Sequence, residues 1–540
     1  MSGEEKFIGV VNSSEVGEDL TETSSVNSGK RHIFDDPKVA AYYRNLYEEK
    51  QFECRHLFDP ELEWTPQEEK SLVRRIDLRV TLWAFVMFMA LDFDRNNISQ
   101  ALSDNMLTDL KLTTADYNLG TTINLVCFLG AELPSQLISK KIGPDRWIPM
   151  QMVLWSVVAI AQTKMVNRGG FLATRALIGL LEGGFIPDIC LWLSYFHTSK
   201  ELTWRLSLFY IANPLASIVT SLLAFAIFRL SGQNGLQGWR WLFLIEGVIT
   251  LAAGLVSFFR MPASIVQTKT WFRKSGWWTS DRQQSIAVNR VLRDDPSKGD
   301  MHNREAVTVK GLFKSLIDYD LWPIFLIRYL GDINAQPTKN YMTLTLRYLG
   351  FSPFNTNLLT IPYSFVNILF LFVSPWLVSK GNYTWSYLVQ PLWNLPCLIA
   401  LRYWPGAQKE VWPTYALLTI LLSGPQMWAV SIGWCSANSN SVRMRTVSAA
   451  IVNMASQAAS ITSANIYQPH DAPLYHRGNV ALIIISIFSL LSVIFANVYY
   501  RYRNYTRDKI WKSMTLEQQH DYVESTTDRG NKRLDFRFSF

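Results

Sequence analysis

Stretches of about 20 predominantly apolar residues recur along most of the chain and alternate with shorter polar stretches. Because a membrane-spanning helix needs about 20 such residues, the pattern predicts about twelve spans. Their approximate limits are 78–101, 119–139, 147–165, 170–193, 205–229, 241–260, 321–342, 356–378, 386–403, 411–433, 446–467 and 479–500. The longest interruption falls after the sixth span. We therefore predict an all-α membrane protein whose two six-helix halves, 78–260 and 321–500, enclose a site near the middle of the membrane.

The polar segments at both ends and between the halves are predicted to lie in the cytosol. The N-terminal tail lacks the basic start and apolar core of a cleaved signal, and its opening through Ser28 has the composition of a disordered segment. Arg74 and Arg75 precede the first span, and Arg501 and Arg503 follow the last. Basic residues concentrate on the cytosolic side of membrane proteins. The predicted cytosolic segments are 1–77, 261–320 and 501–540.

One helix start can be read within the N-terminal tail. Thr65 precedes Pro66, and Glu68 follows three residues after the threonine. This spacing predicts that Thr65 caps a short helix, with Pro66 in its first position and Glu68 completing a capping box.

Composition narrows the class of protein further. Charged residues make up 18% of the chain, below the ~25% usual for soluble domains. The net charge of +8 comes from Lys and Arg that lie between the apolar runs rather than in one patch, so we expect no nucleic-acid partner. The five cysteines are far apart and lack CxxC spacing. The sequence therefore indicates neither a disulfide framework nor a metal site, and we expect no cofactor.

An enzyme is not indicated either. A membrane enzyme would need a nucleophile, a metal or an acid/base cluster, yet all seven histidines fall in predicted tails or loops. No GxSxG, HExxH or P-loop motif is present.

Charged residues interrupt the end of the first predicted span. Asp92, Asp94 and Arg95 follow the apolar run directly. An Asp or Arg at the centre of a membrane helix costs roughly 2.5 to 3.5 kcal/mol. Such residues usually face a water-filled cavity or a partner and mark a pathway, so transport is the first functional hypothesis.

Several motifs resemble, in order and spacing, those of a known transporter family. They are DRNNI at 94–98, KKIGPDRW at 140–147, RALIGLLEGGFIP at 175–187, GWRWLF at 238–243 and LRDDPSKGD at 292–300. With these motifs, the chain from about Glu69 to Arg503 is similar to the major facilitator superfamily. Within it, the chain resembles the fungal allantoate-permease branch of the anion:cation symporters.

This resemblance implies a major facilitator fold with twelve spans, alternating access and proton-coupled uptake of a small anion. Members of the branch carry sulfonates and inorganic sulfur anions, nicotinate, biotin, pantothenate, allantoate, cysteine or small peptides. We expect import of a small organic or sulfur-containing anion, with a sulfonate or sulfur anion favoured. The alternatives are a vitamin-like carboxylate or allantoate, or a non-transporting nutrient receptor. We expect a monomer in the plasma membrane.

Arg175 and Glu182 in the fourth span lie seven residues apart, about two helical turns, and therefore share one face. A rise of 1.5 Å per residue separates them by roughly 10 Å, too far for an ion pair within one helix. The fork of Arg175 matches a carboxylate or sulfonate, and a desolvated Glu182 is suited to bind a proton. The alternative is that both only lock helices together.

In the first span, the resemblance assigns proton coupling to Asp94 and a charge facing the anion to Arg95. Asp92 departs from the family, which usually has an apolar or aromatic residue there. Because Asp92 and Arg95 are three residues apart, they can pair on one helix face. If they do, Arg175 carries most of the attraction for the anion.

The second half contributes further candidates. Arg328 and Asp332 have the i, i+4 spacing of a structural ion pair, and Asp332 is also a candidate for proton coupling. Lys339 is expected to extend toward the outer membrane surface. Gln457 and Asn465 on the eleventh span are candidates for hydrogen bonds to the substrate, with helix–helix contact as the alternative.

Asp145 and Arg146 lie in the loop between the second and third spans. The resemblance implies that this loop controls the equilibrium between inward and outward states, through contacts made in one state only. The spacing of Gly179 and Gly183 predicts close helix packing.

Overall fold

The computed structural model describes residues 33–515, apart from 36, 50–51, 270–273, 275, 279, 295, 297–316, 381, 408 and 440–441. Beyond 515 it describes residues 518–519, 522, 526 and 530–540. The opening stretch predicted to be disordered lies outside the described residues.

Helices dominate both halves, as the apolar pattern predicts. The N-terminal half comprises α3 (Leu82–Ser103), α4 (Met106–Asp109), α5 (Thr114–Ile142), α6 (Pro144–Ala161), α7 (Arg168–Glu182), α8 (Phe185–Ser194), α9 (Ser199–Ile227) and α10 (Gly238–Arg260). The C-terminal half comprises α13 (Trp322–Ile333), α14 (Gln336–Tyr348), α15 (Pro353–Leu358), α16 (Ile361–Lys380), α17 (Tyr383–Tyr403), α18 (Val411–Leu422), α19 (Trp428–Ser439), α20 (Val442–Ala464) and α21 (His476–Ser513).

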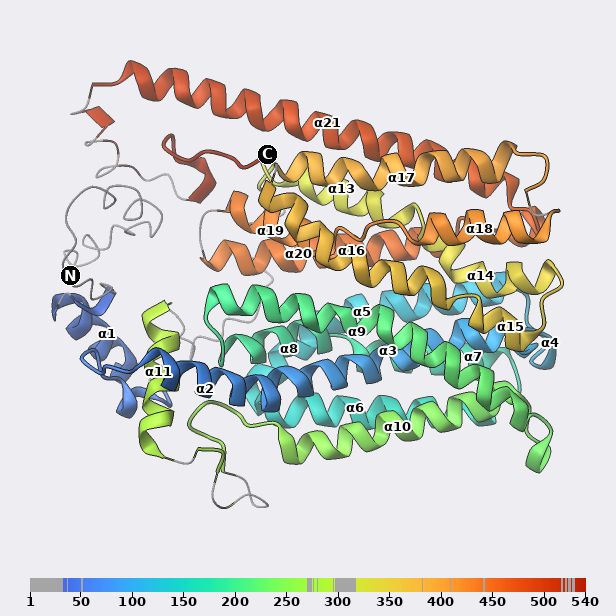
Figure 1. Cartoon of the computed structure of the whole chain (residues 1–540), viewed down its shortest axis with the longest axis horizontal. Coiled ribbons are helices and arrows are strands. Elements are labelled where there is room, and N and C mark those ends of the chain that lie inside the picture. The colour runs from blue at the N-terminus through green and yellow to red at the C-terminus, as the bar shows by residue number, and fades with distance from the viewer. Residues whose placement is uncertain are drawn as a thin grey trace.

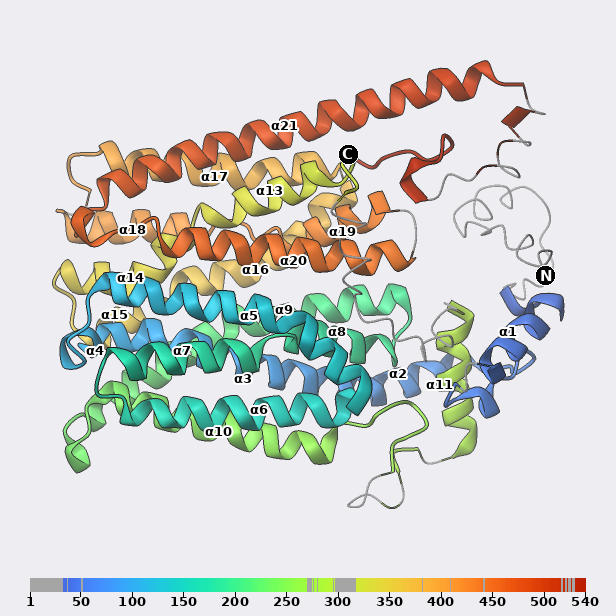
Figure 2. The same ribbon diagram turned by 180° about the vertical axis from the view of Figure 1, so that it is seen from behind.

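The two halves lie side by side as separate helical bundles, and the tail helix α1 (Pro37–Glu49) and the C-terminus lie toward the same end of the bundles (Figures 1 and 2). Every predicted span coincides with one or two of these helices, and the described residues contain no strand. The predicted all-α fold is therefore confirmed. By length and composition alone, four described segments are apolar enough to cross a membrane: Arg168–Ser194, Trp204–Leu230, Gly238–Arg260 and His476–Ser513.

Four predicted spans are each broken into two helices. The fourth breaks between α7 and α8 at Gly183 and Gly184, and Gly184 adopts the left-handed conformation at φ +84°, which glycine accepts without a steric penalty. The seventh breaks between α13 and α14 ahead of Pro337, and the eighth breaks between α15 and α16 at Leu359 and Thr360. The tenth breaks between α18 and α19 at Gly424 and Pro425. Broken helices leave backbone polar groups free, and inside a membrane these are tolerated where they line a cavity or are buried in protein.

The predicted close packing of the fourth span is confirmed. A Cβ atom on Gly179 would stand 2.2 Å from the carbonyl oxygen of Asn124, and one on Gly183 would stand 2.6 Å from the Cβ of Ala131. Both neighbours belong to α5, so the two glycines allow α7 to approach α5 at backbone distance.

The halves contact each other closely at the end of the bundle away from the termini. One buried cluster there includes Ala101 and Tyr117 from the first half and Tyr341 and Tyr467 from the second. Asn118 donates a hydrogen bond to the carbonyl of Tyr467 at 2.8 Å. The other described hydrophobic clusters each lie within one half and its adjoining tail or linker. The space between the halves is therefore closed at this end.

The N-terminal tail and the linker fold together into a unit that we call the terminal module. It comprises the described residues 33–76, with α1 (Pro37–Glu49) and α2 (Pro66–Ile76), and α11 (Asp281–Asp294) of the linker. Asn289 of α11 accepts a hydrogen bond from the backbone N–H of Asp59 and donates one to the carbonyl of Leu57. Buried tail residues Tyr47 and Phe58 pack in the same cluster as α11. The tail is thus partly a folded unit.

The helix start predicted at Thr65 is confirmed within this module. Thr65 and Glu68 form a capping box, and Pro66 occupies the first turn of α2. A hydrogen bond from Arg282 lowers the pKa of the exposed Glu68 carboxyl to about 2, because it stabilises the charged form.

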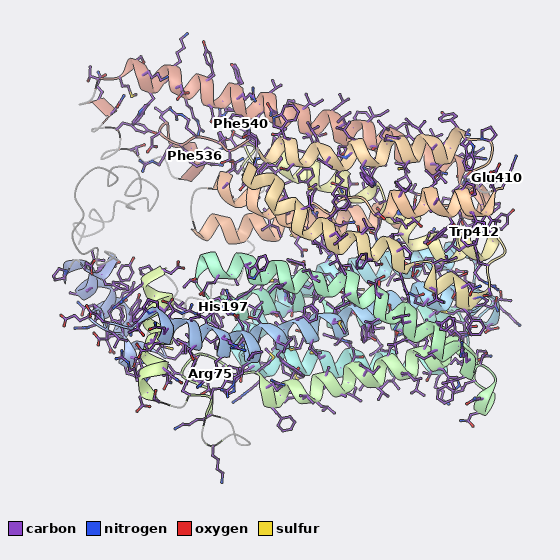
Figure 3. The ribbon with its side chains drawn as sticks, viewed as in Figure 1. Arg75, His197, Glu410, Trp412, Phe536 and Phe540 are labelled. Carbon is purple, nitrogen blue, oxygen red and sulfur yellow. The ribbon has the colours of Figure 1, made fainter. Side chains whose placement is uncertain are left out.

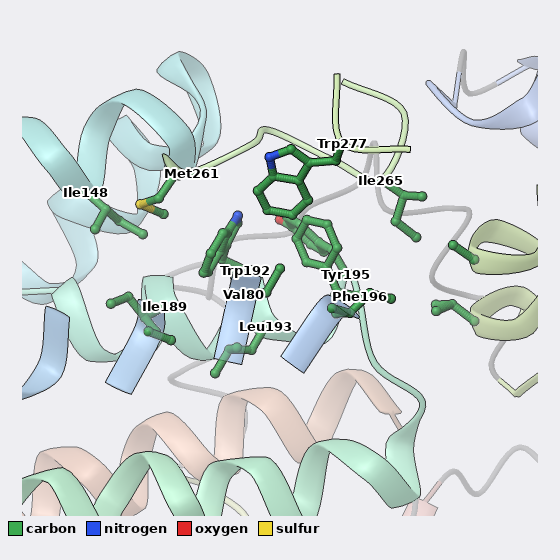
Figure 4. Close-up of a cluster of buried hydrophobic side chains, with 14 of the residues drawn as sticks. Val80, Ile148, Ile189, Trp192, Leu193, Tyr195, Phe196, Met261, Ile265 and Trp277 are labelled. Carbon is green, nitrogen blue, oxygen red and sulfur yellow. The ribbon is translucent and has the colours of Figure 1, made fainter. Parts of the chain in front are cut away.

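An aromatic cluster anchors the terminal module on the first half. Trp277 of the linker lies 6.4 Å, ring to ring, from Phe196, which follows α8, and Trp192 of α8 donates a hydrogen bond to the carbonyl of Pro262 (Figure 4). Arg290 of α11 binds Glu201 at the start of α9 at 2.6 Å. The module is therefore joined to α8 and α9 of this half.

The end of the chain is also folded, although its charged composition predicts a soluble tail. Residues 530–540, which we call the C-terminal clasp, return to the termini end of the second half, where Phe536 and Phe540 lie (Figure 3). Trp434 of α19 donates a hydrogen bond to the carbonyl of Ser539. Lys532 contacts the carboxylates of Asp318 at 2.6 Å and Asp320 at 2.5 Å.

Lys532→Ala should lower the melting temperature of the purified protein. Burial alone would lower the pKa of Lys532, but its hydrogen bonds to Asp318 and Asp320 raise the pKa, so the lysine is charged at neutral pH. Its removal takes a cation away from both carboxylates, and that of Asp320 is fully buried. We expect a decrease of at least about 2 °C. Lys512→Ala, on the exposed last turn of α21, is the control. Equal melting temperatures for both variants would contradict a stabilising clasp.

Candidate functional site

A cavity of about 320 Å³ lies between the two halves. Helices α3, α5, α7 and α9 line it from the first half, and α13, α14 and α20 line it from the second. Its walls carry seven charged side chains, which are Asp92, Asp94, Arg95, Arg175, Glu182, Arg328 and Lys339. Seven of the charged residues that interrupt the predicted spans therefore converge on one space.

Arg95 and Glu182 form an ion pair across this cavity wall. The Nε of Arg95 lies 3.1 Å from a carboxylate oxygen of Glu182, and the Arg95 guanidinium stands 4.9 Å above the ring of Phe128. The side chain of Glu182 is 2% exposed, whereas that of Arg95 is 31% exposed. Arg95 thus faces the cavity and Glu182 lies behind it.

The pairing of Arg95 with Asp92, which their spacing allows, is not the ion pair that the structure shows. Among the described residues, the ion-pair partner of Arg95 is Glu182, because the break after α7 brings that carboxylate to α3. Asp92 is 1% exposed, and its Oδ2 has no hydrogen-bond partner in the described part of the chain. Helical spacing identifies Asp92 as an acid on the same helix face as Arg95 but cannot identify an acid on another helix.

Arg175, two turns before Glu182 on α7, is buried in the cavity wall. Its Nη2 donates a hydrogen bond to the Oε1 of Gln162, which follows α6, and its Nε is buried without a partner among the described residues. No sequence signal points to Gln162, because a glutamine at the end of a predicted span is not unusual. Arg175 is held by a neutral partner, so its positive charge is not cancelled there.

Asp94 points into the first half. One carboxylate oxygen accepts a hydrogen bond from the indole N–H of Trp155 on α6 at 3.0 Å, and the other has no partner among the described residues. Asp94 is 1% exposed yet forms part of the cavity wall. It therefore connects the cavity with the interface between α3 and α6.

The second half supplies a cation, an acid and a hydroxyl. Arg328 and Asp332 form the predicted i, i+4 ion pair at 2.8 Å. Ser456 of α20 donates a hydrogen bond to Asp332 and accepts one from Arg328 at 3.0 Å. Asp332 lines a smaller pocket of about 110 Å³ that shares Lys339 with the main cavity.

Lys339 is the residue that sequence reasoning places least accurately. Instead of extending toward the membrane surface, it lines both pockets, because α14 begins again after the break at Asn334 and Ala335. In the described part of the chain, no hydrogen bond or ion pair of its amino group is found. The expectation for Lys339 is therefore wrong, and it adds a cation to the site.

The two amides proposed for the eleventh span lie in different places. Gln457 lines the cavity. Asn465 is exposed and donates a hydrogen bond to the hydroxyl of Thr122 on α5 at 2.9 Å. Asn465 thus joins the two halves at the closed end, in agreement with the helix–helix alternative.

Asp145 and Arg146 stand at the start of α6, outside the cavity lining. The Nε of Arg146 lies 4.0 Å from an Asp145 oxygen, and the Arg146 side chain is 76% exposed. Their assignment to a conformational switch stays a prediction.

Comparison with known proteins places this arrangement in a wider context. The family model described as Major Facilitator Superfamily matches residues 84–496. An uncharacterized transporter of Saccharomyces cerevisiae is 43% identical over 518 residues, which cover 96% of this chain and 95% of the relative. The major facilitator-type transporter hxnP of Emericella nidulans is 24% identical over 452 residues, 82% of this chain and 88% of hxnP.

Solved structures share the fold at low sequence identity. The proton:xylose symporter XylE bound to 6-bromo-6-deoxy-D-glucose matches with a TM-score of 0.59 and 14% identity, over 77% of this chain and 94% of XylE. A bacterial homolog of the human lysosomal transporter Spinster, in an inward-facing and unoccupied conformation, matches with a TM-score of 0.57 and 13% identity. That match covers 80% of this chain and 98% of the homolog.

Proposed function

Because the chain belongs to the Major Facilitator Superfamily, we propose that it imports a small organic or sulfur-containing anion together with protons, by alternating access. Family membership establishes a membrane transporter rather than an enzyme. The anion, the coupling to protons and the direction of transport are our proposal, and they rest on the chemistry of the cavity.

The observation that carries the proposal is the surplus of positive charge in the cavity wall. Four cations and three carboxylates line it, and the fourth cation, Lys339, comes from the opposite half to Arg95 and Arg175. A guanidinium fork binds planar or tetrahedral oxyanions through two parallel hydrogen bonds. An anion held between Arg175 and Lys339 would contact both halves, as an alternating-access substrate must.

Proton coupling follows from the pair of Arg95 and Glu182. While Glu182 is ionised, it competes with the anion for the Arg95 guanidinium. A proton on Glu182 removes this competition and leaves Arg95, which faces the cavity, free to bind the anion. Release of the proton restores the ion pair and weakens the anion site, so each ligand favours binding of the other. Asp94 and Asp332 are the further acids that we assign to proton binding.

The closed end of the bundle supports a proposal about which state of the transport cycle the structure represents. We place both termini and the linker in the cytosol, so the contacts between the halves lie on the outer side and the described state faces inward. Asp145 and Arg146 would then make their state-dependent contacts on the cytosolic side. We propose that the transporter acts as a monomer in the plasma membrane.

The substrate class we favour is a sulfonate or an inorganic sulfur anion. Such an anion keeps its charge at acidic pH, where a proton gradient is strongest, and its oxygens can accept hydrogen bonds from Arg95, Arg175 and Lys339 at once. This matches the allantoate-permease branch that the motifs resemble. A vitamin-like carboxylate, allantoate, and a receptor that binds without transport are the outcomes that the experiment distinguishes.

The test is uptake of labelled sulfonates, sulfate, nicotinate, biotin, pantothenate and allantoate by cells that carry this protein as their only such transporter. We expect saturable uptake of a sulfur anion at acidic pH that collapses when the proton gradient is dissipated. Uptake of a carboxylate instead would retain the transporter but overturn the sulfur preference. Binding without uptake, with protein at the cell surface, would identify a receptor.

Lys339→Ala should raise the KM for the anion at least about tenfold, because a charged hydrogen bond contributes about 1.5–3 kcal/mol. Lys339→Arg, which keeps the charge, should stay within about threefold of the parent protein. Kinetics of uptake in cells, corrected for surface protein, measure both values. An unchanged KM in the alanine variant would show that Lys339 does not bind the anion.

A further inference from the structure

Glu246 on α10 is a buried acid to which the transport site assigns no role. Its side chain is fully buried, and neither carboxylate oxygen has a hydrogen-bond partner among the described residues. It follows the GWRWLF motif but does not line the cavity. Burying an ionisable side chain within a membrane helix costs free energy, so a residue of this kind usually has a function.

The surroundings of Glu246 are tightly packed. A Cβ atom on the next residue, Gly247, would stand 2.8 Å from the Cγ1 of Ile160, and one on Gly254 would stand 3.0 Å from the Cβ of Met152. Both contacts bring α10 against α6 at nearly backbone distance. Interfaces this close hold a proton more readily than a hydrated metal ion.

One charged group acts directly on Glu246. Asp94 on α3 is close enough to interact with it electrostatically, and α3 packs against α10. Besides α3, α10 contacts α6, α9 and the 3-10 helices Gln162–Lys164 and Phe228–Leu230. The charged residues of α6 are Asp145 and Arg146 at its first turn, and those of the 3-10 helices are Lys164 and Arg229. The described charged side chains of α9, Glu201 and Arg205, lie in its first two turns. The remaining charges of α10 itself, Arg240 and Arg260, stand in its first and last turns. No cation of α6 or α10 therefore stands near the middle of this interface.

Asp94 itself connects to the transport site. It lies in the field of Glu182 and Arg175, and only one of its oxygens is satisfied, by Trp155. Asp94 and Glu246 together present four carboxylate oxygens, and in the described residues a single one accepts a hydrogen bond. Two ionised carboxylates in such a setting repel each other and lack solvation, whereas one shared proton relieves both penalties.

We propose that Asp94 and Glu246 form a second proton-binding site, separate from Glu182, in which Glu246 stores a proton behind the cavity and Asp94 passes it to the cavity. This inference rests on the proposed function, since it adds a coupled proton to the same transport cycle. In the transfer step, the O–H bond of Glu246 breaks as an O–H bond forms on Asp94. Asp94 then releases the proton to water in the cavity.

The test is the number of protons moved with each anion, measured in proteoliposomes for the parent protein, Glu246→Gln and Glu410→Gln. Glutamine imitates the protonated acid but releases no proton. We expect the ratio to fall by one proton per anion in Glu246→Gln. It should stay unchanged in Glu410→Gln, whose side chain is exposed at the opposite end of the bundle from the termini (Figure 3). An unchanged ratio in Glu246→Gln would overturn the inference.

Infrared difference spectroscopy tests whether Glu246 carries a proton, even if Glu246→Gln does not transport. The parent protein at neutral pH should show the C=O stretch of an unsolvated carboxylic acid, and Glu246→Gln should lose it while melting at the same temperature. A band that persists in Glu246→Gln would overturn the inference. Transport that requires sodium instead of a proton gradient would overturn it as well. If the parent protein moves no protons with any anion, it is the proposed function that fails.

Discussion

Arg175→Ala is expected to reduce anion uptake by about 100-fold or more while the protein still reaches the cell surface. Truncating one partner of a buried, hydrogen-bonded charge costs about 2–5 kcal/mol, and every 1.4 kcal/mol is a factor of ten in binding. Here the loss removes a cation of the cavity wall and leaves Gln162 unpaired in a buried position. Lysine should restore only part of the uptake, because it lacks the planar fork.

Initial rates of uptake, with surface protein measured in the same cells, test this expectation. The matched control is Arg229→Ala, because Arg229 is exposed and its guanidinium rests on Phe225 away from the cavity. The control should transport normally. Normal transport by Arg175→Ala would show that this arginine only joins helices, which is the alternative left open by its spacing from Glu182.

Glu182→Gln is expected to abolish accumulation of the anion against its gradient while exchange of anion across the membrane continues. The amide oxygen of glutamine can still accept the hydrogen bond from the Nε of Arg95, so the geometry of the 3.1 Å contact is conserved. The amide cannot bind or release a proton. The two functions therefore separate in this variant, although they are inseparable in the parent protein.

Counterflow and net accumulation in the same proteoliposome preparation measure the two functions. We expect counterflow within about threefold of the parent protein and net accumulation near background. Equal losses of counterflow and net accumulation would show that Glu182 has a structural role, as the residue that holds Arg95 and the end of α7 in place.

The order and approximate limits of the spans could be predicted because apolar length alone determines a membrane span. The breaks within four spans could not. Gly184, for example, permits a left-handed turn, but glycines are common in membrane helices, so its presence does not distinguish a break from close packing. The sequence around Gly179 and Gly183 contains both features at once, and only the packing was predicted.

The sequence predicts most of the charged residues of the site but few of the contacts that they make. Asp94, Arg95, Arg175 and Glu182 were recognisable because charge inside a span is costly, and all four line the cavity. Their partners come from other helices, such as Gln162 for Arg175, and helical spacing contains no information about those. Lys339 was assigned to the membrane surface since its distance along the chain was counted on an unbroken helix.

The terminal module and the C-terminal clasp were missed for a related reason. Both tails are polar on average, and a polar average predicts exposure. Their few apolar residues, among them Tyr47 and Phe538, are nevertheless buried. They pack against the linker helix and against α21, which are distant in the sequence.

Proton movement that depends on the anion is the most direct test of the proposed transport mechanism. The purified protein is placed in liposomes that contain a pH-sensitive dye, and the anion identified by uptake in cells is added outside at acidic pH. We predict acidification of the lumen that requires the anion, is absent with Glu182→Gln, and persists when the membrane potential is clamped at zero. Accumulation of the anion without acidification would contradict proton coupling, and with it the proton-binding roles proposed for Glu182 and Asp94.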